Sequence, residues 1–238
     1  MKTPTAPEVP GLSRGRVLEV EVMDDAVEVK AYLDGVATAH LDRMDDTFVA
    51  AALRGLARRQ RSPLALDVGT GTGALPVKMA LARPGLKVIG LDMAAPMLAE
   101  ARQRARAAGV ADRVVFRRGN GRRLPFPDRS FDLVVSNSML HHIPDPAAVM
   151  DEMSRVLKPG GALFVRDLRR PHPSVIARHI REHGRHYRGT MLRLFSDSVR
   201  AAFTESELRE IVGRSALGRR RGATVRRMFA AYLVVEIR

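Results

Sequence analysis

The sequence predicts an α/β fold built on a mostly parallel, doubly wound β-sheet, and two observations support this. Between residues 64 and 166, short apolar runs of strand length alternate with longer segments of helical periodicity. Strands that are each followed by a helix need crossover connections and therefore lie parallel. In addition, the first run, Leu64–Val68, breaks into a turn with glycines at positions 69, 71 and 73. Such a turn is typical of a nucleotide-type cofactor site, because it needs positive φ and a close backbone approach to the ligand.

The expected elements follow in order along the chain. Core strands are expected at 64–68, 86–91, 114–117, 131–136 and 162–166, and core helices at 74–82, 95–108 and 146–157. Upstream, we expect a short extra strand at 16–22 and helices at 24–40 and 44–59. Downstream, Thr204 and Glu207 form a capping-box pattern for a helix to about Gly213. The apolar runs 223–228 and 232–237 are close enough in sequence to form a hairpin.

One domain with four parts fits the length of 238 residues. We expect a flexible tail over 1–15, N-terminal cap helices over 16–63, and a core over 64–238 in which the helical insertion 168–203 forms a substrate lid. The sequence shows neither an apolar stretch long enough to span a membrane nor the apolar segment of a secretory signal. It contains no cysteine, which excludes disulfides and thiolate chemistry and fits a cytoplasmic protein.

The net charge of +14 is concentrated at the C-terminal end. Residues 166–238 carry 17 arginines and 7 acidic groups. An arginine-rich genomic composition explains the preference for arginine over lysine, but it does not explain this uneven distribution. An anionic ligand or nucleic acid is the functional alternative.

The glycine turn leaves two cofactor classes open. Gly69, Gly71 and Ala74 fit the dinucleotide fingerprint G-x-G-x-x-[GA]. However, a strand before a dinucleotide loop usually stays apolar up to its first glycine, whereas Asp67 lies two residues before Gly69. A carboxylate at this position can face a positively charged group such as an α-ammonium, which argues against a dinucleotide.

Further runs of sequence extend the pattern. After LDVGTGTG come GLDMAAPML, RRGNGRRLPFPDRSFDLVVSNSMLHHIPD and EMSRVLKPGGALFV. Together they resemble the class I S-adenosylmethionine-dependent methyltransferases, most closely the small-molecule group that includes the quinone-biosynthesis C-methyltransferases. The resemblance is strong over 64–166, general over 1–63 and 204–238, and weak over 168–203. It implies a Rossmann-like, seven-stranded sheet with an antiparallel C-terminal hairpin strand, S-adenosylmethionine as cofactor and S-adenosylhomocysteine as product.

The resemblance also implies roles for residues at the strand ends. Asp67 corresponds to the acid that meets the methionine ammonium, and Asp92 to the acid that takes the ribose hydroxyls; the alternative for Asp92 is a helix N-cap. Asn120 stands where the family usually has an aspartate for the adenine amino group, and the alternative for Asn120 and Gly121 is a simple turn. The remaining residues of the expected cofactor site are Gly69, Thr70, Gly71, Met93, Ser136 and Asn137.

Methyl transfer is an in-line displacement, so the enzyme must align the reactants and exclude water. His141 is our candidate general base, and Asp167, at the end of the fifth strand, is a second catalytic candidate; both also fit structural roles. For the substrate we expect contacts from Tyr32, Arg166, Arg169, Arg170 and Tyr187. Arginine side chains suit carboxylate or phosphate, which predicts an anionic small molecule, with a solvated basic surface and ordinary packing as alternatives.

The sequence thus predicts an S-adenosylmethionine-dependent transfer of a methyl group to a small, anionic acceptor. His179, His183 and His186 share helical spacing but lack an HExxH pattern, so we predict no metal. Three alternatives stay open: an RNA methyltransferase, an S-adenosylmethionine-binding protein that transfers no methyl group, and an oxidoreductase. The acceptor, the atom that is methylated and the oligomeric state are left open.

Overall fold

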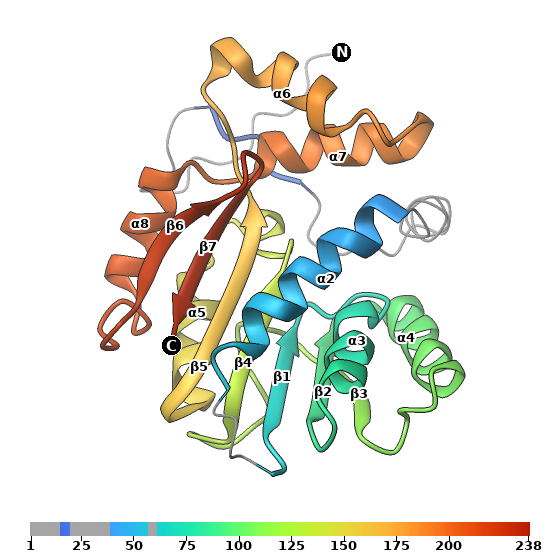
Figure 1. Ribbon diagram of the computed structural model, residues 1–238. Coiled ribbons are helices and arrows are strands. Elements are labelled where there is room, and N and C mark those ends of the chain that lie inside the picture. Colours follow the sequence, from blue (N-terminus) through green and yellow to red (C-terminus); the bar gives the residue numbers. More distant parts are fainter. Residues whose placement is uncertain (1–14, 20–38, 57–60) are drawn as a thin grey trace.

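The computed structural model describes residues 15–19, 39–56 and 61–238, and its centre is one seven-stranded sheet. The strands are β1 (Leu64–Val68), β2 (Lys87–Asp92), β3 (Val114–Arg118), β4 (Phe131–Asn137), β5 (Leu157–Leu168), β6 (Thr224–Met228) and β7 (Tyr232–Ile237). Their order in the sheet is β3-β2-β1-β4-β5-β7-β6. The first five strands pair in parallel, and β7 is antiparallel to both β5 and β6 (Figure 1). The predicted fold class is confirmed.

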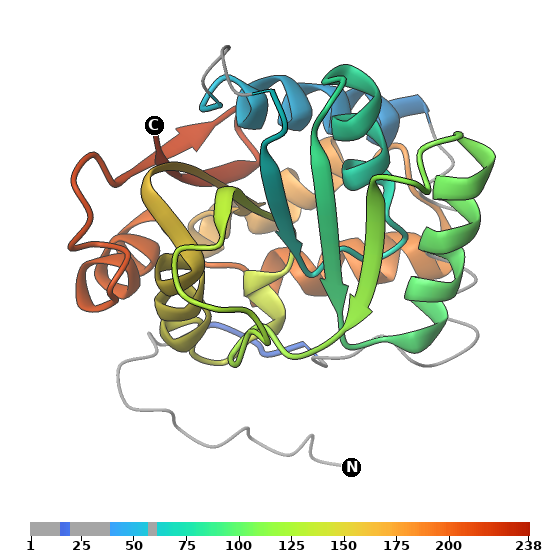
Figure 2. The same ribbon diagram turned by 90° about the horizontal axis from the view of Figure 1, so that it is seen from below.

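Helices cover both faces of this sheet. They are α2 (Ala39–Leu53), α3 (Ala74–Ala82), α4 (Ala95–Ala107), α5 (Ala147–Val156), α6 (Ile176–His183), α7 (Gly189–Ala201) and α8 (Glu205–Arg214), with short 3-10 turns at Leu140–His142 and Pro173–Val175. The helices α2 and α3 lie on one face and α5 and α8 on the other (Figure 2). The segment α6–α7 lies across the carboxyl ends of the parallel strands (Figure 1).

Two apolar clusters hold the layers together. One joins α2, α3 and α4 to the sheet and includes Phe48, Met79 and Leu133. The other joins α5 and α8 to the opposite face and includes Met153 and Leu208. Each of these side chains is at most 1% exposed, and burying one such side chain contributes about 1.5–3 kcal/mol. The two clusters fix the strand ends, where the polar residues gather.

Local sequence patterns predicted the positions of most helices and strands correctly. Helix α3 has the predicted bounds, and both hydrogen bonds of the Thr204–Glu207 capping box are present. The predicted start of β5 was wrong, because the strand begins at Leu157 and not at residue 162. Leu157 pairs with Phe131, and Ala162 is the next partner, opposite Leu133. Residues 158–161 therefore form the expected turn as a bulge inside the ladder.

The N-terminal expectations can be checked only in part. Helix α2 begins at Ala39, earlier than the predicted residue 44, and ends at Leu53. The expected helix at 24–40 lies almost entirely outside the described residues. The described part of the expected strand, residues 16–19, carries no strand, although Val17 N donates to Arg200 O at 3.3 Å. Within the described chain, no helix has the length and apolar character needed to cross a membrane.

Candidate functional site

A cavity of about 300 Å³ opens at the carboxyl ends of β1, β2 and β4. Its wall is formed by the glycine turn after β1, the end of β2, the turn after β3, the loop after β4 and helix α7. Open α/β sheets bind their ligands at this edge, because the loops that follow the strands meet there. The cavity therefore coincides with the region where the sequence placed the site.

The glycine turn is held against β2 by its backbone. Gly69 N and Thr70 N both donate to Leu91 O, at 2.8 and 3.0 Å. Gly69 has φ +74°, and a Cβ atom there would collide with the side chain of Met139. Gly71 has φ +50°, but a Cβ atom there would meet no atom within 4 Å, because this residue borders the cavity. The turn thus exposes backbone to the cavity at Gly71.

Asp67 lies beneath this turn and is 1% exposed. Its Oδ2 accepts a hydrogen bond from Thr70 Oγ1 at 2.7 Å, whereas its Oδ1 has no hydrogen-bond partner among the described residues. Burial raises the pKa of Asp67 to about 7, with the hydrogen bond from Thr70 acting in the opposite direction. A buried carboxylate with an unsatisfied oxygen favours a cationic group nearby.

The acid at the end of β2 also contacts the turn. Asp92 Oδ2 accepts from Gly71 N at 2.8 Å, and Asp92 Oδ1 accepts from Ala94 N at 2.9 Å. Each carboxylate oxygen can accept a further hydrogen bond. Met93 lies beside Asp92 on the cavity wall. Asp92 therefore combines the helix-start contact with a position facing the cavity.

Of the remaining residues expected to bind the cofactor, three line the cavity and one is buried between strands. Asn120 and Gly121 line the cavity, but Asn120 Oδ1 accepts from Arg122 N at 2.8 Å within its own turn. Ser136 is fully buried and donates to Val68 O at 2.7 Å, so its side chain joins β4 to β1. Asn137 lines the cavity.

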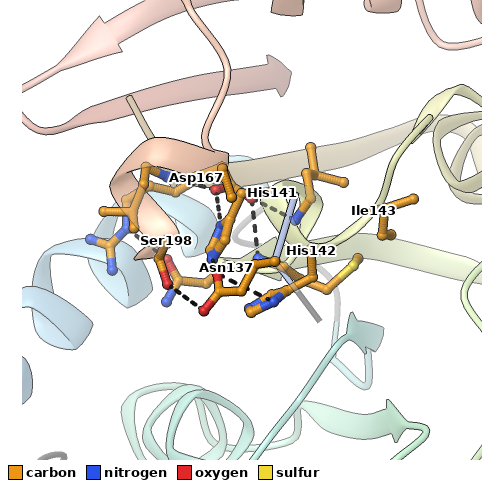
Figure 3. A network of polar contacts seen from close by, with 12 residues as sticks. Asn137, His141, His142, Ile143, Asp167 and Ser198 are labelled. Carbon is orange, nitrogen blue, oxygen red and sulfur yellow. Dashed lines mark hydrogen bonds and ion pairs between the residues drawn. The ribbon is translucent and has the colours of Figure 1, made fainter. Parts of the chain in front are cut away.

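The two catalytic candidates lie in direct contact. His141 Nδ1 lies 2.6 Å from Asp167 Oδ1, and both side chains are buried (Figure 3). Asp167 Oδ2 accepts from Leu140 N at 2.6 Å and from Met139 N at 3.1 Å. Burial alone would lower the pKa of His141, but the neighbouring Asp167 carboxylate outweighs burial, so the pKa of His141 is raised. For Asp167 the effects are reversed: burial alone would raise its pKa, but the contact with His141 outweighs burial, so the pKa of Asp167 is lowered.

Glu19 is a residue of this site that sequence reasoning missed. It comes from the segment before α2, and its Oε2 lies 3.8 Å from His141 Nε2 and 3.6 Å from His142 Nδ1. Both its distance from the motifs in sequence and its place in an expected strand hid it. Asp45 of α2 also borders the cavity, and burial raises its pKa to about 6 against the opposing effect of Arg166.

None of the three arginines expected to bind the substrate lines the cavity. Arg166 is 1% exposed and donates to Asn137 Oδ1 at 2.8 Å. Arg169 donates to Ala230 O at 2.9 Å, and Arg170 forms an ion pair with Glu207. Each guanidinium therefore holds parts of the chain together at these contacts.

The two expected tyrosines have different outcomes. Tyr187 lines the cavity and packs against Phe195, with ring centroids 5.2 Å apart. Tyr32 lies outside the described residues. Three side chains of α7, Met191, Leu194 and Phe195, give the cavity an apolar wall that the sequence analysis did not single out. The amphipathic pattern of α7 was the available signal.

Comparisons with known proteins bear on this site. Residues 66–165 match a family described as a methyltransferase domain. A demethylmenaquinone methyltransferase of Lactiplantibacillus plantarum is 45% identical over 113 residues, 47% of each protein. A 27-O-demethylrifamycin SV methyltransferase of Amycolatopsis mediterranei is 40% identical over 124 residues, 50% of this chain and 45% of that protein. The chain thus spans about half the length of these curated relatives.

Solved structures share the fold. The magnesium protoporphyrin IX methyltransferase of Synechocystis, with bound S-adenosylhomocysteine, has a TM-score of 0.63. The likeness covers 89% of this chain and 94% of that one at 18% sequence identity, so it concerns the fold.

Proposed function

We propose that this chain, whose residues 66–165 match a methyltransferase domain, is a class I S-adenosylmethionine-dependent methyltransferase that transfers a methyl group from S-adenosylmethionine to a small-molecule acceptor. The observation that carries the proposal is the cavity itself. The glycine turn and Asp92 line one side of it, with Asp67 buried beneath the turn, and His141, held by Asp167, lines another.

The residues at the strand ends fit this cofactor. The unsatisfied Oδ1 of buried Asp67 matches an ammonium group, and the carboxylate of Asp92 can accept two hydroxyl hydrogen bonds. The absence of a side chain at Gly71 leaves space for close approach. When bound, S-adenosylmethionine supplies an electrophilic methyl group on a sulfonium centre.

We assign to His141 the role of general base, which takes the proton of the acceptor. Its Nδ1 is held by Asp167, so the proton of the neutral imidazole resides on Nδ1 and the Nε2 lone pair is available. A base at this position removes a proton from an acceptor hydroxyl as the oxygen attacks. Asp167 acts through His141: it fixes the orientation and the tautomer of the ring.

The cavity favours an acceptor with an apolar body. Met191, Leu194 and Phe195 form one wall, and the three arginines expected to bind an anion lie elsewhere. The names of two relatives specify demethylmenaquinone and 27-O-demethylrifamycin SV, the second with an oxygen as the methylated atom. We therefore propose a hydroxylated apolar acceptor whose anionic character arises at the reacting oxygen, once His141 has taken its proton.

Turnover tests this proposal. The purified chain is incubated with S-adenosylmethionine and a panel of hydroxynaphthoquinones and phenols, and S-adenosylhomocysteine is quantified with and without each acceptor. We expect formation that depends on the acceptor, and loss of it in His141→Asn. Asp92→Ala should weaken S-adenosylhomocysteine binding at least about tenfold, the loss of one or two charge-assisted hydrogen bonds. Asp197→Ala on α7, where the side chain is about half exposed, controls for the change of charge. Binding of the cofactor without turnover on any acceptor would contradict the transferase assignment.

A further inference from the structure

Three potential metal ligands converge at the acceptor end of the cavity. Glu19 Oε2, His141 Nε2 and His142 Nδ1 all lie within 4.8 Å of one another. Glu19 Oε2 is 3.8 Å from His141 Nε2 and 3.6 Å from His142 Nδ1. These separations exceed hydrogen-bond length, so an atom can fit between the groups. Two ligands about 2.1 Å from a common ion lie at most about 4.2 Å apart, which both separations satisfy.

His141 is arranged as a metal-binding histidine usually is. Its Nδ1 contacts the Asp167 carboxylate at 2.6 Å, which leaves the Nε2 lone pair directed at Glu19. Metal-ligating histidines almost always donate their other ring N–H to a carboxylate or carbonyl, because this fixes the tautomer and the ring orientation. Asp167 is fixed in turn by the backbone N–H of Leu140 at 2.6 Å. The contact between His141 and Asp167 involves none of the three ligand atoms and orients His141 for metal binding.

The ligands come from two segments that are pinned together. Arg16 donates hydrogen bonds to His141 O at 2.7 Å, Ile143 O at 2.9 Å and Pro144 O at 2.9 Å. Ser198 Oγ lies 3.2 Å from Glu19 Oε1, so the other oxygen of Glu19 is the one turned toward the imidazoles. Arg16 therefore holds the segment that carries Glu19 against the histidine loop, and Ser198 orients the Glu19 carboxylate.

We propose that Glu19, His141 and His142 bind a divalent transition-metal ion of the zinc or cobalt type. Two imidazoles and one carboxylate suit these ions better than magnesium or calcium, which prefer oxygen ligands. Three protein ligands leave a position open toward the cavity. The consequence for activity rests on the proposed function: an ion on His141 Nε2 occupies the lone pair that takes the acceptor's proton. Metal binding therefore blocks methyl transfer and leaves the cofactor end of the cavity, at the glycine turn and Asp92, unaffected.

Direct binding is the first test. Zn²⁺ and Co²⁺ are titrated into the metal-stripped full chain by calorimetry, and the visible absorption of bound Co²⁺ is recorded. We expect one ion per chain. Glu19→Gln and His142→Gln should each weaken binding at least about tenfold. His183→Ala is the matched control, because it removes an imidazole beside His179 in α6 that lies outside the cluster.

Two outcomes overturn the site. One is the lack of saturable binding by the unsubstituted chain, which would mean that Glu19 only forms ion pairs with the two imidazoles. The other is an equal loss of binding in His183→Ala and in the cluster variants. If one cluster variant fails to fold, the other variant and the Co²⁺ spectrum of the unsubstituted chain still decide.

The regulatory consequence has its own readout. Zn²⁺ should abolish acceptor-dependent S-adenosylhomocysteine formation over the concentration range in which it binds, without changing the affinity for S-adenosylhomocysteine. In each cluster variant, inhibition relative to its own metal-free rate should need at least about tenfold more Zn²⁺. Unchanged turnover at saturating Zn²⁺ would overturn inhibition. Failure to find any acceptor would count against the proposed function alone, because the binding measurements need none.

Discussion

His141 Nδ1 and Asp167 Oδ1 lie 2.6 Å apart, and both side chains are almost completely shielded from solvent. Asp167 also accepts hydrogen bonds from the backbone N–H of Met139, Leu140 and Leu168. One carboxylate therefore fixes the end of β5, the start of the loop after β4 and the orientation of the histidine. The geometry of the candidate base depends on this single acid.

The first prediction concerns the stability that this pair contributes. Asp167→Asn and His141→Asn should each lower the free energy of unfolding by about 3–5 kcal/mol, because each leaves a buried polar partner uncompensated. The double variant should cost clearly less than the sum, since the two residues share one interaction. Urea unfolding of the four proteins, followed by circular dichroism, measures both quantities. Additive losses would show that the two side chains are energetically independent.

Asp67 predicts a dependence of cofactor affinity on pH. Burial raises its pKa to about 7, so the carboxyl group is largely neutral at pH 5.5 and largely ionised at pH 8.5. Only the ionised form attracts an ammonium group. The affinity for S-adenosylhomocysteine should therefore fall about tenfold per pH unit below 7, since one pKa unit corresponds to a factor of ten. Calorimetric titrations across this range test it, and Asp67→Asn should show weak binding without this dependence.

The same shift predicts the opposite trend for the stability of the ligand-free protein. Because the folded pKa of Asp67 lies above its ordinary value of 3.8, the folded state binds this proton more tightly than the unfolded state. The stabilisation is fully present below about pH 3.8 and is lost as the pH rises to about 7. Relative to Asp67→Asn, the ligand-free protein should thus lose stability between pH 5 and 8. A parallel pH profile for the two proteins would contradict the assignment.

The sequence predicted what depends on local pattern and topology. The bounds of α3 and the capping box at Thr204 follow from residues near one another in the chain. Asp92 and Asn137 could be placed at one edge because the ends of parallel strands meet there. His141 and Asp167 were both candidates for this reason, although their contact was not foreseen.

The rest depended on side-chain direction and on distant segments. Arg166 follows the same strand-end logic as Asp167, but its guanidinium contacts Asn137 and the backbone of Met44. Nothing in the local pattern indicates this, because the partners come from other elements. Glu19 joins residues more than a hundred positions away, so no spacing in the sequence could reveal it.

Arg170 provides a prediction that separates stability from binding. It forms an ion pair with Glu207, and both side chains are largely buried. Arg170→Met should therefore lower the free energy of unfolding by about 3–5 kcal/mol, because Glu207 would keep a poorly compensated charge. The exposed Arg178→Met on α6 should have little effect. Chemical denaturation gives these values, and turnover measured well below the melting temperature should show an unchanged KM for the acceptor. A raised KM with unchanged stability would restore the substrate role that the sequence suggested.

The glycine turn offers a matched pair of substitutions, Gly69→Ala and Gly71→Ala. Both residues have positive φ, which costs a non-glycine residue about 1–2 kcal/mol. At Gly69 the new methyl group would also collide with Met139, so this variant should lose more stability than Gly71→Ala. At Gly71 the methyl group enters open space at the cavity wall, so its main effect should be weaker S-adenosylhomocysteine binding. Thermal unfolding and calorimetry on both variants distinguish the two effects. If Gly71→Ala bound the cofactor as tightly as the unsubstituted chain, the turn would not approach it at this residue.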